Sequence, residues 1–523
     1  MVRLEHLAAD VLGLGPVELA ALSGQLADSG VARRLEEVQR PADHRLPAER
    51  AQLACWLEAQ LTRHGPPVAV LDSVRALAEP GTTCALAEVH PALLGGPLEQ
   101  LLAAIQVVRL AEELSRSGPR VVPVLWCHGD TCESETLGRA TVLNRFHEPQ
   151  TVCLEPLAAG RQPLDRVAVD PGEHGLGALR AVLDQLYGDH PRIDEALDLL
   201  LPRAGETLPG ALARAMHDLL GHRGLVVLEP EMLREELSGA LARAVLAPFE
   251  PIPRSEELGL PGPDEVPVLK LENGQLQPLV RGGEGFRFPD EPGSRTPAEL
   301  AAAIVQEPMK WFPGPQLSSL LPLQALPVCA LVGTRGSLER QLTLTGLRER
   351  LQLPAPALVP AVRASLLDDE TRGSLERLGL GPAEALGARG RWMPAEEAAG
   401  EPGPLERLAA LEASLRSSLN AERRALAEID PTLGPVVRTA VRGVEEAFRR
   451  LKKRVEHVQQ NRGGKLLRHA RRVNGTLCPD GRPQAEVLSA LPWLSRHGRG
   501  WVEDLAGELD PFGAEHLLVH LGG

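Results

Sequence analysis

The chain has 523 residues, a formal net charge of −14 at pH 7, 43% hydrophobic residues and only 3% aromatic residues. This length predicts two or three domains rather than one simple core. The acidic balance argues against general affinity for nucleic acid or for an anionic membrane surface. The sequence lacks a run of about 18 apolar residues, the length that a membrane-spanning helix needs. Acidic residues interrupt the apolar part of the N-terminus, so we expect a soluble cytoplasmic protein without a signal peptide.

Cysteine usage is sparse for a chain of this length. An odd number of scattered cysteines favours reduced thiols over a disulfide framework. Only Cys127 and Cys132 lie close together, and they lack both CxxC spacing and a second pair that would complete a zinc site. We therefore expect no metal centre. The seven cysteines are Cys55, Cys84, Cys127, Cys132, Cys153, Cys329 and Cys478.

The N-terminal part of the chain is expected to be helical. Residues 1–45 contain one or two amphipathic helical patterns and predict a small helical appendage. Residues 46–64 form a stronger helical pattern, which Gly65-Pro66-Pro67 ends. This helix is expected to precede the first strand of the core.

Residues 82–135 carry the clearest pattern in the chain. A β-rich segment (82–89) leads into a loop with Gly95, Gly96 and Pro97, and apolar residues then recur at helical spacing up to Gly118. A short apolar strand (121–126) and an acidic loop (127–135) follow. Strand, glycine loop, helix and strand in this order are typical of a βαβ unit in a parallel sheet. The pocket of such a sheet lies at the carboxyl ends of its strands, and the helix N-terminus there can attract an anion.

The remaining segments complete the predicted domain organisation. Leu225–Leu228 is a buried-strand candidate, and Asn273-Gly274 is a hairpin signal within a segment rich in Pro and Gly. Apolar residues stepping by threes and fours after residue 404 indicate a coiled coil. The predicted domains are the appendage (1–45), a first part of an α/β core (46–248), a connecting insertion (249–316), a second part of the core (317–383), a linker (384–403), the coiled coil (404–473), and a tail packing on the core (474–523).

The segment LLGGPLEQLLAAIQVVRLAEEL, followed by VVPVLWCHGDTCESE, resembles the bacillithiol biosynthesis cysteine-adding enzymes, the BshC family. Members carry TGQQ-x-GL-x-GGPL, then VPVFW and a TEDHD-type loop. The tail also resembles the family, since Leu477, Gln484 and Leu491-Pro492 keep their places in its pattern. The chain is thus identified as a divergent member, with the resemblance running from about Leu46 to Leu521. It implies a Rossmann-like, mostly parallel α/β core with inserted connecting segments, a C-terminal helical coiled-coil hairpin and a homodimer formed through that hairpin.

The resemblance also implies an activity. Members are cysteine ligases that add cysteine to glucosaminyl-malate in the last step of bacillithiol biosynthesis, so the implied partners are these two small molecules. Amide formation in water is uphill unless the carboxylate is activated, which makes ATP or another nucleotide the expected driver. The site then needs an anion cradle, a cation for developing negative charge and a base for the amine proton.

Candidate site residues follow from this comparison. The glycine loop is as suitable for close helix packing as for anion binding, whereas an acidic loop such as 127–135 is more often a solvated strand end. The five donor-type side chains in residues 127–133 lack a second ligand cluster, which argues against zinc. The candidate catalytic residues are Asp130, Glu133 and His128. The candidate substrate- or nucleotide-binding residues are His90, Gly95, Gly96, Pro97, Trp126, Gly333, Arg335 and Gly336.

Several pocket positions depart from the family pattern. Ala103 stands where members have a lysine, Cys132 replaces the histidine of the acidic loop, and the TGQQ segment reads AEVH, which leaves His90 at a glutamine position. The alternative interpretation is therefore a catalytically degenerate member that serves as a binding or regulatory scaffold. A third hypothesis is nucleic-acid binding through the basic residues 449–472. It is weakened because this segment contains no Phe, Trp or Tyr on which bases could stack.

Overall fold

The computed structural model describes most of the chain. Among the described residues, no helix is both long enough and apolar enough to cross a membrane. The chain divides into two units, residues 1–369 together with 475–523, and residues 370–474. The described residues are 2–13, 15–26, 29–39, 47–63, 65–131, 134–157, 161–246, 265–282, 285–288, 293–393, 404–430, 433–462 and 465–522.

A five-stranded sheet forms the centre of the first unit, and each neighbouring pair of its strands is parallel. The strands predicted at 82–89, 121–126 and 225–228 are confirmed as β2, β3 and β6. The fold is thus α/β and Rossmann-like, as the resemblance implied. In spatial order the strands are β12 (Ala357–Pro360), β11 (Val328–Gly333), β2 (Thr83–Val89), β3 (Val121–Cys127) and β6 (Val226–Leu228).

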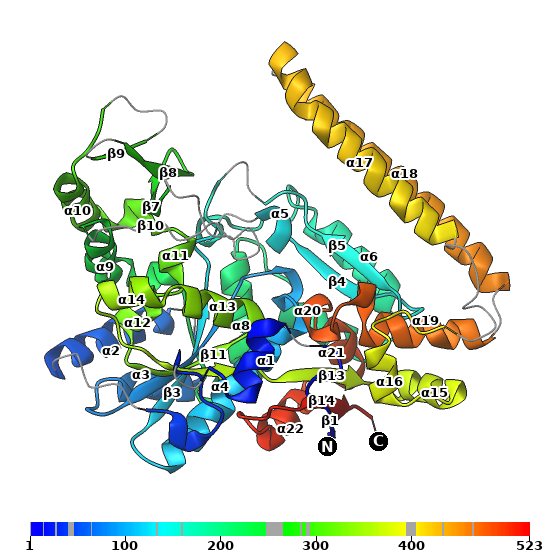
Figure 1. Cartoon of the computed structure of the whole chain (residues 1–523), viewed down its shortest axis with the longest axis horizontal. Helices are drawn as coiled ribbons and strands as arrows, with labels where there is room; N and C mark the ends of the chain where they lie inside the picture. Colours follow the sequence, from blue (N-terminus) through cyan, green and yellow to red (C-terminus); the bar gives the residue numbers. More distant parts are fainter. Residues whose placement is uncertain are drawn as a thin grey trace. The chain divides into compact units, whose positions relative to one another are not determined.

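The central strands are buried on both faces, which explains their nearly continuous apolar sequences. In β3, Val122, Val124 and Trp126 belong to one hydrophobic core, whereas Leu125 and Cys127 belong to the other. Successive side chains of a strand point to opposite faces, so one strand serves two cores. Helix α4 (Leu98–Arg116) packs on one face of the sheet (Figure 1). Helices α2 (Pro47–Thr62) and α3 (Val68–Ala76) pack on the other face. Helix α2 is the helix predicted at 46–64.

The strand order contains a topological switch point. From β2 the chain adds β3 and β6 on one side, and it later adds β11 and β12 on the other. The connections that leave the carboxyl ends of β2 and β11 therefore diverge, which opens a crevice between them. This crevice is the expected place for a ligand in an open parallel sheet.

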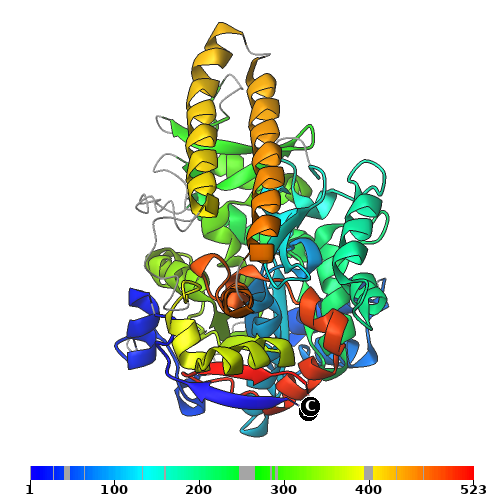
Figure 2. The ribbon, with the colours of Figure 1, turned by 90° about the vertical axis from the view of Figure 1, so that its right-hand side faces the viewer.

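A smaller sheet joins the two ends of the chain and corrects the expectation of a purely helical N-terminus. Helix α1 (Pro16–Ser23) is present, but residues 3–7 form strand β1. Strand β1 (Arg3–Leu7) pairs antiparallel with β14 (His516–His520), which pairs parallel with β13 (Arg363–Leu367). Figure 2 shows β1 in blue beside the red β14. The partner of β1 lies about 500 residues away, so the local pattern could not indicate a strand.

Gln484, one of the tail residues that match the family pattern, anchors the tail. Its side chain is fully buried at the start of α20 (Gln484–Val487). The amide nitrogen donates to the carbonyl oxygens of Leu366 and Thr476, and its oxygen accepts from the Leu366 N–H at 2.7 Å. The side chain thus continues the hydrogen bonding of β13 into the tail.

The connecting segment contains the predicted hairpin. Strands β7 (Glu265–Glu272) and β8 (Gln275–Gly282) are antiparallel, and Asn273 and Gly274 both have positive φ, as a type I′ turn requires. Strands β10 (Trp311–Pro313) and β9 (Gly285–Arg287) complete a four-stranded sheet. Residues 247–264, which include the start of the predicted insertion, lie outside the described residues.

The second unit contains the helical hairpin that the sequence predicted. Helices α17 (Pro404–Ile429) and α18 (Leu433–Arg462) run side by side (Figure 2), and Glu412 of α17 forms an ion pair with Lys452 of α18. The unit also holds α15 (Asp369–Leu378), α16 (Pro382–Gly387) and most of α19 (Lys465–Leu477). It begins at residue 370, within the segment expected to belong to the core.

Shorter elements complete the first unit. They are α5 (Ser134–Leu137), β4 (Arg139–Leu143), β5 (Pro149–Cys153), α6 (Leu176–Tyr187), α7 (Ile193–Leu200), α8 (Leu208–Leu220), α9 (Arg234–Leu246), α10 (Pro297–Gln306), α11 (Pro315–Ser318), α12 (Leu321–Ala325), α13 (Arg335–Thr343), α14 (Thr345–Arg350), α21 (Leu491–His497) and α22 (Gly500–Glu508).

We expect Gln484→Leu to lower the free energy of unfolding by about 3 kcal/mol, because one N–H and two carbonyl groups would lose their buried partner. Urea unfolding followed by circular dichroism measures this change. Gln52→Leu, on the exposed face of α2, is the matched control and should change stability by no more than about 0.5 kcal/mol. An equal effect of both substitutions would contradict the anchoring role of Gln484.

Candidate active site

A cavity of about 870 Å³ lies at the switch point. Its walls come from the ends of β2 and β3, the starts of α4 and α13, the β4–β5 hairpin and the tail. The described lining residues are Glu88, Val89, His90, Ala92, Gly96, Pro97, Glu99, Gln100, His128, Thr136, Leu137, Arg139, Ala140, Thr141, Thr151, Thr334, Gly336, Ser337, Arg340, Arg482, Glu486 and Val487. The loops after β2 and β3 therefore meet at one site, as the βαβ pattern predicted.

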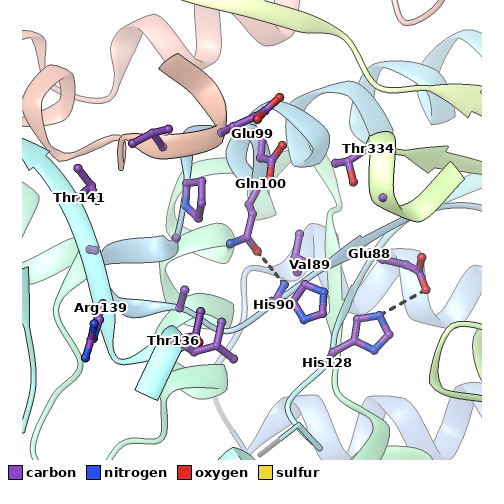
Figure 3. Close-up of a pocket in the computed structure, with 18 of the residues that line it drawn as sticks. Glu88, Val89, His90, Glu99, Gln100, His128, Thr136, Arg139, Thr141 and Thr334 are labelled. Atoms are coloured by element: carbon purple, nitrogen blue, oxygen red, sulfur yellow. Dashed lines mark hydrogen bonds and ion pairs between the residues drawn. The ribbon is translucent and has the colours of Figure 1, made fainter. Parts of the chain in front are cut away.

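Glu88 and His128 form the buried part of this site (Figure 3). The two strand ends are adjacent because Val89 pairs with Cys127, and the His128 N–H then donates to the Val89 carbonyl oxygen. His128 Nε2 lies 3.3 Å from Glu88 Oε1, and His128 Nδ1 lies 2.8 Å from Ser318 Oγ. Ser337 donates to the other oxygen of Glu88 at 2.7 Å. Burial opposes ionisation of Glu88, but contacts with His128 and Ser337 outweigh it and lower the pKa of this carboxyl.

His90 lies beside this pair and opens toward the cavity. Its ring stacks on the His128 ring, with 5.1 Å between centroids and 27° between planes. Its backbone N–H donates to Gln100 Oε1 at 2.8 Å. The side chain is exposed, but it is exposed to a cavity whose protein walls limit its hydration. These walls, followed by the nearby His128 and Arg340, lower the pKa of His90, so the imidazole is neutral at pH 7.

The glycine loop positions the Gln100 side chain. Gly96 has φ of +75°, and a Cβ there would lie 1.9 Å from Gln100 Nε2. Gly96 and Pro97 line the cavity, whereas Gly95 packs toward Leu200. The Leu98 N–H donates to the Leu488 carbonyl oxygen, so the tail occupies one donor of the predicted anion-binding helix end.

Charged side chains of both signs line the cavity. Arg139, Arg340 and Arg482 come from β4, α13 and the tail, respectively. Sequence comparison found no replacement for the family lysine at Ala103, which is itself buried in α4. The structure instead brings in three arginines from distant segments, and no local motif indicated any of them. The acidic lining residues are Glu88, Glu99 and Glu486.

Glu99 has an acidity suited to proton transfer near neutral pH. Burial, and then the neighbouring Glu486 carboxylate, raise the pKa of Glu99 to about 7, while Arg482 acts in the opposite direction. Glu486 lies 3.5 Å from Arg482, one helical turn away in sequence. The sequence signal for Glu99 was weak, because an acidic residue in the first turn of a helix is common.

Asp130 lies in a buried charge cluster and does not line the described cavity walls. Its neighbours are Arg234 and Asp165, and Arg234 lies 3.2 Å from an Asp165 oxygen. Arg234 also stacks over the Phe312 ring, with 3.8 Å between its Cζ and the centroid. Burial raises the pKa of both aspartates, and Arg234 opposes this effect. The cluster joins the loop after β3 to α9.

The other predicted site residues are dispersed. Trp126 is fully buried in the core, and Gly333 packs closely against Leu338, so neither lines the cavity. Gly336 does line it. Arg335 begins α13, and the structure describes its backbone only. Cys132 and Glu133 lie outside the described residues.

Two family models match the chain. The description "Bacillithiol biosynthesis BshC, N-terminal Rossmann-like domain" matches residues 27–248, and "Bacillithiol biosynthesis BshC, C-terminal coiled-coil domain" matches residues 364–521. The chain belongs to the BshC family. The resemblance inferred from the GGPL segment and the tail is thereby confirmed.

Similar family members span most of the chain. A protein of Heliobacterium modesticaldum is 25% identical over 463 residues, which cover 83% of this chain and 82% of the relative. A protein of Symbiobacterium thermophilum is 26% identical and covers 90% of both chains. A protein of Thermus thermophilus is 29% identical, covering 78% of this chain and 82% of the relative. All three are named "Putative cysteine ligase BshC".

The shifted pKa of Glu99 predicts a pH-dependent stability. The folded-state pKa is about 7 against an ordinary value of 4.5. The folded state therefore retains a proton that the unfolded state loses, and the free energy of unfolding falls as pH rises through this window. Glu99→Gln should lessen this fall and be more stable than wild type at about pH 8. Urea unfolding at several pH values measures this effect. Glu508→Gln, at an exposed position, is the control. The prediction would be wrong if the free energy of unfolding of wild type and of Glu99→Gln changed with pH in parallel.

The Asp130 cluster predicts a stability effect at Arg234. Arg234→Met would leave two buried carboxyl groups without their cation and should destabilise the protein by about 3–5 kcal/mol at pH 8. The loss should be smaller at about pH 5, because protonation then neutralises the aspartates more readily. Arg180→Met is the control, since Arg180 contacts Asp194 and Asp198 at the surface. Urea unfolding measures both; equal losses would argue against a buried charge cluster.

Proposed function

We propose that this chain is a cysteine ligase of bacillithiol biosynthesis, which joins the carboxyl group of cysteine to the amine of glucosaminyl-malate. The observation that carries the proposal is the cavity between β2 and β11, which lies where ligands bind in open parallel sheets. The names of the relatives supply the reaction class. The described part of the chain therefore combines the family fold with a pocket at the expected place.

The cavity walls suit anionic reactants. A volume of about 870 Å³ is within the usual range of roughly 300–1,000 Å³ for small-molecule sites. Malate carries two carboxylates, and a nucleoside triphosphate would bring further negative charge. Arg139, Arg340 and Arg482 can pair with such groups, since guanidinium matches carboxylate and phosphate geometry. These arginines would provide the positive charge that the lysine position no longer supplies.

The reaction requires activation of the cysteine carboxylate. A nucleoside triphosphate such as ATP would convert it to an acyl phosphate or acyl nucleotide, whose leaving group departs readily. The amine then attacks the carbonyl carbon, a C–N bond forms, and the bond to the phosphate oxygen breaks. Donors around the carbonyl oxygen and a base for the amine proton would lower the barrier.

The ligase is tested by incubating the purified full chain with cysteine, glucosaminyl-malate and ATP, and detecting the amide product by mass spectrometry. We expect product only when all three are present. Arg340→Met should lower kcat/KM at least tenfold, because a charge-assisted contact is lost, whereas surface Arg180→Met should retain activity. Absence of turnover with each nucleoside triphosphate would favour the scaffold alternative, and a thermal-shift panel would then show whether any reactant still binds.

We also infer that the helical hairpin mediates a homodimer. Leu411, Leu415 and Leu451 on its helices are exposed within the single chain, and burying them against a second copy would remove apolar surface from water. Light scattering of the full chain should give a dimer mass. A variant with Leu411, Leu415 and Leu451 changed to Glu should be monomeric.

A further inference from the structure

The strand ends at the cavity carry a set of side chains whose arrangement suits proton transfer. Glu88, His90 and His128 lie at the ends of two adjacent strands, and His128 contacts both Glu88 and His90 (Figure 3). We propose that His90 is the catalytic base that accepts the amine proton, and that His128, Glu88 and Ser318 are positioning residues that fix its ring. This assignment rests on the proposed ligase function and specifies its proton acceptor.

Burial distinguishes the supporting residues from the base. The Glu88 and His128 side chains are only 6% and 4% exposed, whereas the His90 side chain opens to the cavity. A buried carboxylate costs free energy unless it has partners. Glu88 has two, at His128 and Ser337. Burying this charged cluster at a strand end costs free energy. The His90 ring stacks on the His128 ring of this cluster.

His90 and His128 differ in how many ring nitrogens already have a partner. Both nitrogens of His128 are engaged, one near Glu88 and one with Ser318. None of the described residues hydrogen-bonds to a ring nitrogen of His90, while its backbone is fixed by Gln100. His128 therefore holds the ring from one face, and the ring edge of His90 remains available to a reactant in the cavity.

The charges around His90 favour its neutral form. His128 and Arg340 oppose a positive charge on the ring, Glu88 alone favours it, and the cavity walls reduce hydration. A neutral imidazole has a free lone pair, which a base requires. The lowered pKa also makes the ring a weaker base than a free imidazole, so it releases an accepted proton readily.

The proposed step moves one proton from the amine to His90. The neutral amine nitrogen attacks the activated carbonyl carbon of cysteine, which generates a positively charged nitrogen in the tetrahedral intermediate. This nitrogen gives a proton to His90. The intermediate then collapses, the amide carbonyl forms again, and the phosphate or nucleotide leaves with the electron pair of the broken C–O bond. His90 finally releases the proton to water.

The competing proton acceptor in the same cavity is Glu99, whose pKa is about 7. It belongs to the first turn of α4, whereas His90 lies at the end of β2 (Figure 3). The two assignments predict opposite results when each residue is changed to an isosteric, non-basic amide. This makes them separable by kinetics.

Steady-state kinetics with cysteine, glucosaminyl-malate and ATP tests the assignment. Loss of general-base catalysis typically costs about 10²- to 10⁴-fold, so we expect His90→Gln to lower kcat at least 100-fold. His222→Gln, which changes an exposed histidine, should match wild type. Adding imidazole to His90→Ala should restore part of the rate. Glu88→Gln and Ser318→Ala should lower kcat with little change in either KM, because they act through the ring rather than on a reactant.

Each outcome decides a separate point. No turnover by the wild-type protein would overturn both the ligase function and the base assignment. Wild-type turnover with an unchanged rate for His90→Gln would overturn the base assignment alone, and a 100-fold loss in Glu99→Gln would then identify Glu99. Ser318→Ala is the variant least disruptive to folding. If it and Glu88→Gln raise KM without lowering kcat, the positioning role is wrong.

Discussion

The parallel pairing of β2 with both β3 and β11 is the constraint on which the site depends. In the strand order, the switch point lies between β2 and β11. Because all three strands are parallel, their carboxyl ends reach the same edge of the sheet. The Val89–Cys127 register then sets His90 and His128 side by side. A one-residue slip would exchange the faces of every side chain in the strand.

Buried amide side chains tie the later parts of the chain to this sheet. Gln106 of α4 donates to the carbonyl oxygens of Pro360 and Pro511 and accepts from the Val362 N–H. Gln484 does the same for β13 and the tail. Both amides are fully buried and satisfied at each end, which makes such contacts specific as well as stabilising. The tail is thereby held where Arg482 and Glu486 can line the cavity.

The cavity is lined by His90, which departs from the family motif, and by arginines outside that motif. These arginines are Arg139, Arg340 and Arg482. His90 replaces a glutamine, and it meets His128 and Glu88 at one point. Asp130, which was expected to be catalytic, lies near the buried ion pair of Arg234 and Asp165 and does not line the described cavity walls.

Strong local signals predicted several elements correctly. They are the strands β2, β3 and β6, the helix after Gly96-Pro97, the Asn273-Gly274 turn and the helical hairpin. The sequence also identified the family, because the GGPL segment and the tail keep their spacing. Hydrophobic periodicity and turn chemistry act over a few residues, so they can be read locally. The side chains that face the cavity could not be predicted from local patterns, because they come from segments far apart in the sequence. Arg139, Arg340 and Arg482 meet there through sheet order and tail packing, and β1 pairs with the far end of the chain; such contacts depend on long-range register, which local patterns do not encode.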